Sequence, residues 1–342
     1  MHAALVHASD RLGVELPALS RASDFSTTEI QQARQFFASR VGINHGLDIV
    51  VCGSMARREM STASDFDFLV VAHGLVEDAT RFRSFRAACE DWCTQRAIKP
   101  PGSTGIFGRV VAATELVDQI GLDFDTNASL TRRILMLEEG ISVLEPPLHR
   151  KFVNVSIGRY LHGGQSDPGG TPRFLLNDVV RYWRTIAVDY QAKVWQSLKP
   201  DDWGLRYLKL RISRKLTFVG TLASLFLVEL RQPEDPRSFL VDQFVEVPAL
   251  ARLAQLASDL QDEEESLASL RDVMVIAEEF SEFLADEVRR TAAQQVLPPA
   301  REATDESFSL MRERSVQLQR ALEGLFFDSP KLGPLSRKYL SF

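Results

Sequence analysis

Hydrophobic and polar residues follow two different periods along the chain, and the change falls near residue 150. The segments "LDIVVCG" (47–53), "DFDFLVV" (65–71) and "IFGRVVAAT" (106–114) are rich in β-branched and aromatic residues, which predicts strands. Helical patterns lie between them, and beyond the Gly- and Pro-rich segment 161–172, interpreted as a linker or ordered loop, nearly every pattern is helical. We therefore expect an α+β fold.

The division of the chain follows from this change of period. A mixed-sheet domain, residues 1–150, is predicted to precede an all-α helical bundle, residues 151–342. The first domain also contains an N-terminal helix, "TTEIQQARQFFASRVG", which Ser26 and Glu29 are expected to begin as a capping box. Gly42 is expected to end this helix.

Composition limits the classes of protein that remain. The 342 residues are 45% hydrophobic and 25% charged, and the net charge of −6 argues against a general DNA-binding surface. Cys52, Cys89 and Cys93 form neither a disulfide framework nor a Cys-x-x-Cys metal pair, which favours a reducing, cytoplasmic location. No signal peptide is evident, and the most apolar stretch, 216–230, is short for a membrane span and predicts a core helix. We therefore expect no membrane partner.

Two aspartates interrupt the apolar segment 65–71. Side chains alternate along a strand, so Asp65 and Asp67 are expected to share one face while Phe66 and Phe68 point into the core. Two carboxylates on one face repel each other unless a cation lies between them. Mg²⁺ takes such oxygen ligands together with the phosphates of a substrate, so the pair predicts a magnesium site.

A Gly-Ser pair stands between the first predicted strand and a short predicted helix, eleven residues before Asp65. The free N–H groups at the start of a helix attract phosphate. Gly53 would let the backbone approach the phosphate closely, and Ser54 would add a hydroxyl group. A phosphate-binding loop beside metal-binding carboxylates suits metal-assisted phosphoryl or nucleotidyl transfer.

The segment "GSMARREMSTASDFDF" (53–68) resembles the signature of the DNA polymerase β-type nucleotidyltransferase superfamily, and most of all its branch of PII-protein uridylyltransferase-like proteins. The close resemblance covers about 20 residues and extends loosely over residues 27–140. Arg58 departs from the motif of that branch, which has Gly there, and Thr62 stands in place of Pro. The residues that match without a gap are Gly53, Ser54, Arg57, Glu59, Ser64, Asp65 and Asp67.

The resemblance implies a nucleotidyltransferase fold and an Mg²⁺-dependent enzyme that moves an NMP from an NTP to an acceptor and releases pyrophosphate. Asp65 and Asp67 would be catalytic and would hold two Mg²⁺ ions, and Gly53, Ser54 and Arg57 would bind the nucleotide. The family also has a third carboxylate on a later strand, which holds one metal ion and helps to deprotonate the acceptor.

Three residues are candidates for this third carboxylate: Glu115, Asp123 and Asp125. Asp123 and Asp125 repeat the same-face spacing of the first pair, and we favour Asp125 as the third catalytic residue. The alternative role of Asp125 is the N-cap of the next helix, which Thr126 or Asn127 also suit.

A basic cluster occurs in the predicted helical domain, in "LRYLKLRISRKLTF" (205–218). Arg211, Arg214 and Lys215 lie away from the apolar side of this helix, and we expect them to bind the triphosphate of the NTP. The alternative is an ordinary solvated helix face. The apolar side is made by Leu205, Leu208, Ile212, Leu216 and Val219.

The acceptor is not specified by any residue, and neither is the base of the NTP. A protein or a tRNA is the expected acceptor. A synthase of a small nucleotide signal and a non-catalytic nucleotide-binding regulator remain as alternatives.

Overall fold

The computed structural model describes residues 1–43, 45–76, 78–101, 105–162, 169–196, 202–298 and 305–340. The chain is a mixed α+β protein, as predicted, with a small mixed sheet and a large majority of helix. It divides into two compact units. The sheet unit comprises Ala22–Tyr182 and Gln232–Pro248, and the helical unit comprises Met1–Arg21, Trp183–Arg231 and Ala249–Phe342. The predicted domain boundary at residue 150 stays a prediction.

The sheet has the strand order β3-β2-β1-β4. β1 is antiparallel to both β2 and β4, and β2 is parallel to β3. All three predicted strands are present, but β2 begins later than predicted and the third segment turns into helix at Ala113. The strands are β1 (Leu47–Val51), β2 (Phe68–Ala72), β3 (Arg109–Ala112) and β4 (Ile141–Ser142).

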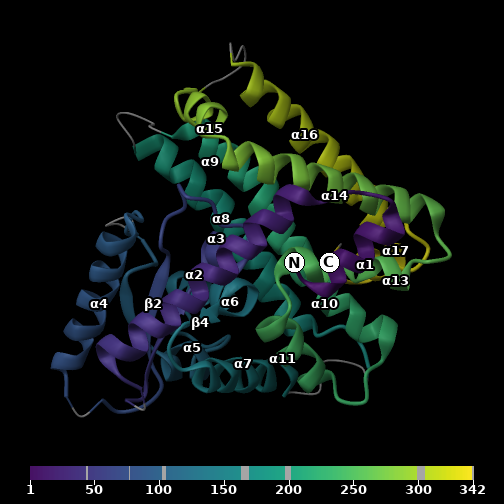
Figure 1. Ribbon diagram of the computed structural model, residues 1–342. Coiled ribbons are helices and arrows are strands. Elements are labelled where there is room, and N and C mark those ends of the chain that lie inside the picture. The colour runs from purple at the N-terminus through teal and green to yellow at the C-terminus, as the bar shows by residue number, and fades with distance from the viewer. Residues whose placement is uncertain are drawn as a thin grey trace. The chain divides into compact units, whose positions relative to one another are not determined.

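The helices of the sheet unit are drawn mainly in blue and teal in Figure 1. They are α3 (Gly53–Ala56), α4 (Thr80–Arg96), α5 (Ala113–Asp118), α6 (Asn127–Glu139), α7 (Pro146–Leu161) and α11 (Pro236–Glu246). Two long helices, α2 (Pro17–Val41) and α8 (Arg173–Gln196), contain the boundaries between the units.

One face of the sheet packs against α2 and α4 and forms the core of the sheet unit. Ile49, Val51 and Val70 alternate along their strands with residues of the other face, and they are fully buried. Aromatic rings fill the space between strand and helices: the ring centroids of Phe37 and Phe66 lie 6.2 Å apart, and those of Phe37 and Trp92 lie 5.8 Å apart. The other face of the sheet therefore carries the positions of Asp48 and Leu69.

The helical unit contains only helices among its described residues, which agrees with the helical pattern predicted after residue 150. Helices α14 and α16 pack together in it, as Figure 1 also shows. Its helices are α1 (Ala3–Leu12), α9 (Trp203–Lys209), the π-helix η1 (Leu210–Arg214), α10 (Lys215–Arg231), α12 (Ala249–Ala254), α13 (Leu256–Asp259), α14 (Glu264–Ala285), α15 (Glu287–Gln294), α16 (Glu306–Glu323), the π-helix η2 (Gly324–Asp328) and α17 (Leu332–Leu340).

The apolar stretch 216–230 is a core helix, as predicted. It forms most of α10, in which Leu222, Leu225 and Phe226 are at most 2% exposed. In the part of the chain that the structure describes, no helix has the length and hydropathy needed to cross a membrane.

The predicted capping box at Ser26 and Glu29 is wrong, because α2 begins at Pro17 and both residues lie inside it. The Ser26 hydroxyl donates to the carbonyl of Ala22 at 2.7 Å and accepts from the N–H of Met60 at 3.0 Å. The predicted end of the helix at Gly42, where φ is +72°, is confirmed. Residues 163–168 of the predicted loop at 161–172 lie outside the described residues.

Candidate functional site

The loop after β1 brings Gly53 against Asp67. The N–H of Cys52 donates to the carbonyl of Asp67 at 2.8 Å, which continues the pairing of β1 with β2. Gly53 has a φ of +69°, in the left-handed region that favours glycine. A Cβ atom at this position would lie 2.8 Å from Oδ2 of Asp67. The backbone conformation therefore favours glycine here, and any larger residue would displace the Asp67 carboxylate, while a close approach of phosphate stays a prediction.

Asp65 and Asp67 lie on the solvent side of the segment that leads into β2. Asp65 is exposed and Asp67 is half-buried, whereas Phe66 and Phe68 are 0% and 4% exposed. This alternation agrees with the predicted shared face of the carboxylates. Asp65 forms an isolated parallel β-bridge with Lys99, so the segment is extended although the regular ladder begins at Phe68. The two acidic groups thus fit beside a core because they do not enter it.

The loop between the glycine and the aspartates contains α3, a single turn that spans Gly53–Ala56. Ser54 is half-buried, and its carbonyl accepts from the N–H of Glu59 at 2.8 Å. Arg58 has a φ of +64°, in the left-handed region that favours glycine. Its guanidinium donates to the hydroxyl of Thr27 at 3.2 Å. The role of the Ser54 hydroxyl as a phosphate contact stays a prediction.

Arg57, predicted to bind the nucleotide, is buried and paired within the protein. Its guanidinium donates to Glu59 at 2.9 Å and to Glu139, the last residue of α6, at 2.5 Å. Burial alone would lower the pKa of Arg57, but the charges of Glu139 and Glu59 outweigh it and raise this pKa. Arg57 therefore ties the end of α6 to the loop, and its contact with a nucleotide stays a prediction.

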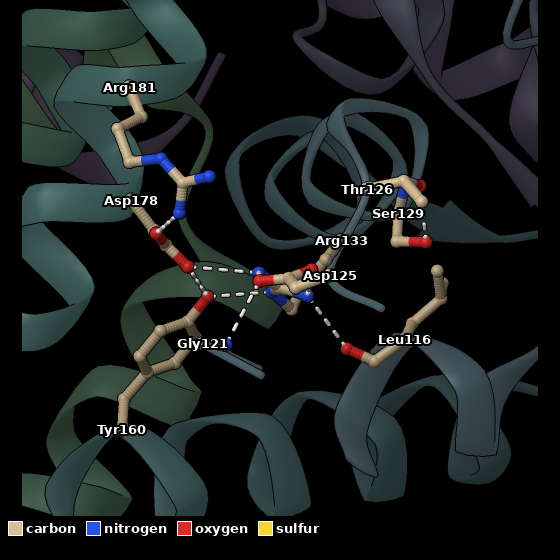
Figure 2. Close-up of polar contacts among 9 residues, drawn as sticks. All are labelled: Leu116, Gly121, Asp125, Thr126, Ser129, Arg133, Tyr160, Asp178 and Arg181. Carbon is tan, nitrogen blue, oxygen red and sulfur yellow. Dashed lines mark hydrogen bonds and ion pairs between the residues drawn. The ribbon is translucent and has the colours of Figure 1, made fainter. Parts of the chain in front are cut away.

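Asp125, the favoured third catalytic residue, belongs to a buried network around Arg133, which Figure 2 shows. Arg133 donates to both carboxylate oxygens of Asp125 at 3.0 and 2.9 Å, and the N–H of Gly121 donates to one of them at 3.0 Å. Arg133 also donates to Asp178 at 2.9 Å and to the hydroxyl of Tyr160 at 2.6 Å. The Tyr160 hydroxyl in turn donates to Asp178 at 2.7 Å.

The electrostatics of this network fit an ion pair. Burial alone would raise the pKa of Asp125, but the hydrogen bonds from Arg133 and Gly121 lower it. Asp125 is not the N-cap of α6, because Thr126 has that place and its hydroxyl accepts from the N–H of Ser129 at 3.1 Å. The contacts of Asp125 are thus those of a structural residue, and its catalytic role stays a prediction.

The other two candidates for the third carboxylate are exposed. Glu115 lies in the first turn of α5, not on the strand expected there, and Asp123 lies in the loop between α5 and α6. The strand position beside Leu69 of β2 is occupied by Arg109.

The basic cluster belongs to the helical unit, whereas the aspartate pair belongs to the sheet unit. Arg211 donates to the hydroxyl of Ser315 at 3.2 Å, and Lys215 donates to the side chain of Gln319 at 2.6 Å, so both half-buried cations contact α16. Burial and then the charge of Arg211 lower the pKa of Lys215 to about 8. Arg214 is half-buried at the end of η1. The predicted apolar side of the helix is confirmed, since its five residues are at most 5% exposed.

Asp48 is a buried carboxylate that the strand prediction treated only as part of an apolar segment. It accepts from the hydroxyl of Ser142 at 2.8 Å and from the N–H of Glu145 at 2.9 Å. Burial raises the pKa of Asp48 to about 7, although these two hydrogen bonds lower it. No local pattern could have indicated this, because both partners lie more than 90 residues later in the sequence.

The chemistry available at the site is that of a carboxylate pair beside a turn in which Gly53 is buried and Ser54 is half-buried. In the part of the chain that the structure describes, no cluster of three or more His, Cys, Asp or Glu side chains has metal-binding geometry. Two carboxylates nevertheless fit Mg²⁺, because this ion commonly takes one or two protein ligands and completes its shell with phosphates and water. Comparison of the chain with protein-family models, with curated proteins and with solved structures gives no match.

Proposed function

We propose that the protein transfers a nucleoside monophosphate from an NTP to an acceptor and releases pyrophosphate. One observation carries the proposal: the carboxylate of Asp67 lies close to where a Cβ atom of residue 53 would be, next to Gly53, while Asp65 stands on the same face of the strand. The resemblance of residues 53–68 to a nucleotidyltransferase motif supports the same function, and with it a nucleotidyltransferase-like fold for the sheet unit.

In the proposed reaction a hydroxyl oxygen of the acceptor attacks the α-phosphorus of the NTP. A new P–O bond forms, the bond from the α-phosphorus to the oxygen that bridges it to the β-phosphate breaks, and its electron pair leaves with pyrophosphate. The hydroxyl proton passes to solvent. The protein contributes by binding: the turn at Gly53–Ser54 holds the phosphates of the NTP, and Asp65 and Asp67 orient the reacting group.

Asp65 and Asp67 would hold Mg²⁺ in this function. When bound, Mg²⁺ supplies positive charge that offsets the charge of the phosphates. Arg57 acts indirectly, because it fixes the loop between the two parts of the site through Glu59 and Glu139.

A nucleotide-binding regulator without transfer activity is the second candidate. It is favoured by the contacts of Asp125, whose two carboxylate oxygens accept hydrogen bonds from Arg133 and Gly121. A protein with only the first carboxylate pair would bind Mg²⁺–NTP and would lack the third group expected to assist the acceptor.

The test is incubation of the protein with each of the four labelled NTPs and Mg²⁺, followed by separation of protein, RNA and small products. We expect Asp65→Ala and Asp67→Ala to abolish transfer. We also expect their melting temperatures without Mg²⁺ to stay equal to or above that of the wild type, since the change removes like-charge repulsion. Asp91→Ala is a matched control, because its exposed ion pair with Arg40 contributes little to stability.

The outcomes separate the two candidates. Label on any product from the wild-type protein, lost in both variants, supports nucleotidyl transfer. Binding of Mg²⁺–NTP by the wild type without any labelled product supports the regulator. Wild-type activity in both aspartate variants would refute the metal site.

A further inference from the structure

The face of the sheet that carries the aspartates also carries two cations on the side of β3. Lys99 pairs with Asp65 in a parallel β-bridge, and Arg109 pairs with Leu69 in the β2–β3 ladder. Paired residues of neighbouring strands point to the same face, and Leu69 follows Asp67 by two residues. Lys99 and Arg109 are both exposed and therefore accessible to a ligand on the aspartate face.

A second observation supports the direction of Arg109. Arg132 lies on α6, and its pKa is lowered first by burial and then by the positive charge of Arg109, so the two guanidinium groups repel each other electrostatically. Glu115 offsets part of this positive charge. The Nε atom of Arg132 is buried, and within the described residues it has no hydrogen-bond partner. Two neighbouring arginines with an unsatisfied donor are typical of an anion-binding site.

The two sides of the aspartate pair differ. Gly53 and Ser54 follow β1 and lie on one side of β2, whereas Lys99 and Arg109 lie on the other, because β2 stands between β1 and β3. If the NTP occupies the β1 side, the acceptor occupies the β3 side. This assignment of sides rests on the proposed function.

We infer that Lys99 and Arg109 bind a phosphate group of the acceptor, and that the acceptor is a nucleotide or an oligonucleotide. From the spacing of strands and of residues, the Cα atoms of Asp67 and Arg109 are roughly 8 Å apart, which leaves room for one phosphate between their side chains. Asp65 and Glu115 offset part of the positive charge on this side, and a phosphate group can offset the rest, whereas an uncharged alcohol or a protein hydroxyl group cannot. The chemistry of the β3 side therefore selects for a phosphate-bearing molecule.

The test measures binding and does not depend on turnover. Adenosine 5′-monophosphate, adenosine and the 5′-phosphorylated trinucleotide pApApA are the probes, each titrated in the presence of saturating Mg²⁺ and a non-hydrolysable NTP. The variant is Lys99→Ala with Arg109→Ala. The control is Arg86→Ala, an exposed arginine on α4, the helix that covers the opposite face.

We expect adenosine 5′-monophosphate to bind more tightly than adenosine. Each exposed cation contributes about fivefold to this difference in affinity. The affinity of the double variant for adenosine 5′-monophosphate therefore falls about 25-fold and equals its affinity for adenosine. The control variant keeps the wild-type affinities. Tighter binding of pApApA than of the mononucleotide, with the same loss in the double variant, identifies an oligonucleotide acceptor, and equal binding identifies a nucleotide.

Two results overturn the inference. Equal affinity of the wild type for adenosine and its monophosphate shows that no phosphate is bound there. A loss of NTP affinity in the double variant as large as the loss for the monophosphate assigns the cations to the donor. Failure of the proposed function is a separate result, since it appears as absent binding of Mg²⁺–NTP to the wild-type protein or as NTP binding without any labelled product in the transfer assay.

Discussion

Replacing Gly53 by alanine separates the stability of the loop from its function. The left-handed backbone, with φ of +69°, costs a residue with a Cβ atom about 1–2 kcal/mol. Alanine recovers about 0.5–1 kcal/mol of this, because it loses less backbone freedom on folding. The net destabilisation is therefore about 1 kcal/mol, or a fall in melting temperature of about 2–4 °C for a domain of about 150–250 residues.

The new methyl group also meets a functional atom. It would lie 2.8 Å from Oδ2 of Asp67, which is too close, so the carboxylate must turn away. The end of a side chain moves easily, so this displacement adds little to the loss of stability. It does, however, remove one of the two groups proposed to hold Mg²⁺, so we expect Gly53→Ala to lose binding of Mg²⁺–NTP.

Gly46→Ala is the matched control. Gly46 has nearly the same φ, +67°, and lies in the same unit, but an added Cβ atom would meet nothing within 4 Å. Both variants are melted with and without Mg²⁺ and an NTP at about 100 times the dissociation constant, which stabilises a binding-competent protein by about 2.7 kcal/mol. We expect equal losses without ligand, and stabilisation by ligand in Gly46→Ala alone. Equal stabilisation of both variants by Mg²⁺–NTP would refute the role given to Asp67.

Two further predictions concern buried carboxylates. In Glu139→Gln the buried Arg57 loses its ion pair with Glu139 and keeps the one with Glu59. We expect a destabilisation of about 3 kcal/mol in denaturant melts. Glu59→Gln, at a more exposed position, should cost less, and equal costs would contradict this ranking. The pKa of Asp48 rises on folding from 3.8 to about 7, so its ionisation destabilises the folded state progressively between these pH values. The stability of Asp48→Asn relative to the wild type should thus increase with pH across this window and stay constant above it; a constant difference throughout would refute the buried position of the charge.

Local patterns in the sequence were sufficient to predict structure where the environment of a residue depends on its neighbours along the chain. The strands of "LDIVV" and "FLVVA", the exposed aspartates between buried phenylalanines, and the apolar side of the helix at 205–219 are all present in the structure. The start of α2 was mispredicted because Ser26 and Glu29 suit a capping box locally but have distant partners instead. Ser26 accepts from Met60, and Glu29 pairs with Arg96.

The buried charges were beyond prediction for the same reason. Arg133 stands in a helical segment whose pattern gives no sign that an arginine is 0% exposed, and one of its partners, Asp178, lies 45 residues later. Arg57 matched a family motif, but Glu139, its partner in the structure, is 82 residues away. Such pairs depend on tertiary packing, and one sequence records only the residues and not their pairing.

The π-helix η1 has a consequence for insertions and deletions in the helical unit. A π-turn holds one residue more than an α-turn, so deleting a single residue from Leu210–Arg214 would restore ordinary helical geometry. The five residues of η1 turn the chain by roughly as much as four residues of an α-helix, about 400°, so the helices before and after the deletion would keep their relative orientation. Leu222 and Phe226 of α10 would therefore stay in their buried positions. A deletion in the regular part of α10 would instead rotate the residues on its two sides by about 100° relative to each other. Within this helix, η1 is thus the segment where the loss of one residue disturbs the core least.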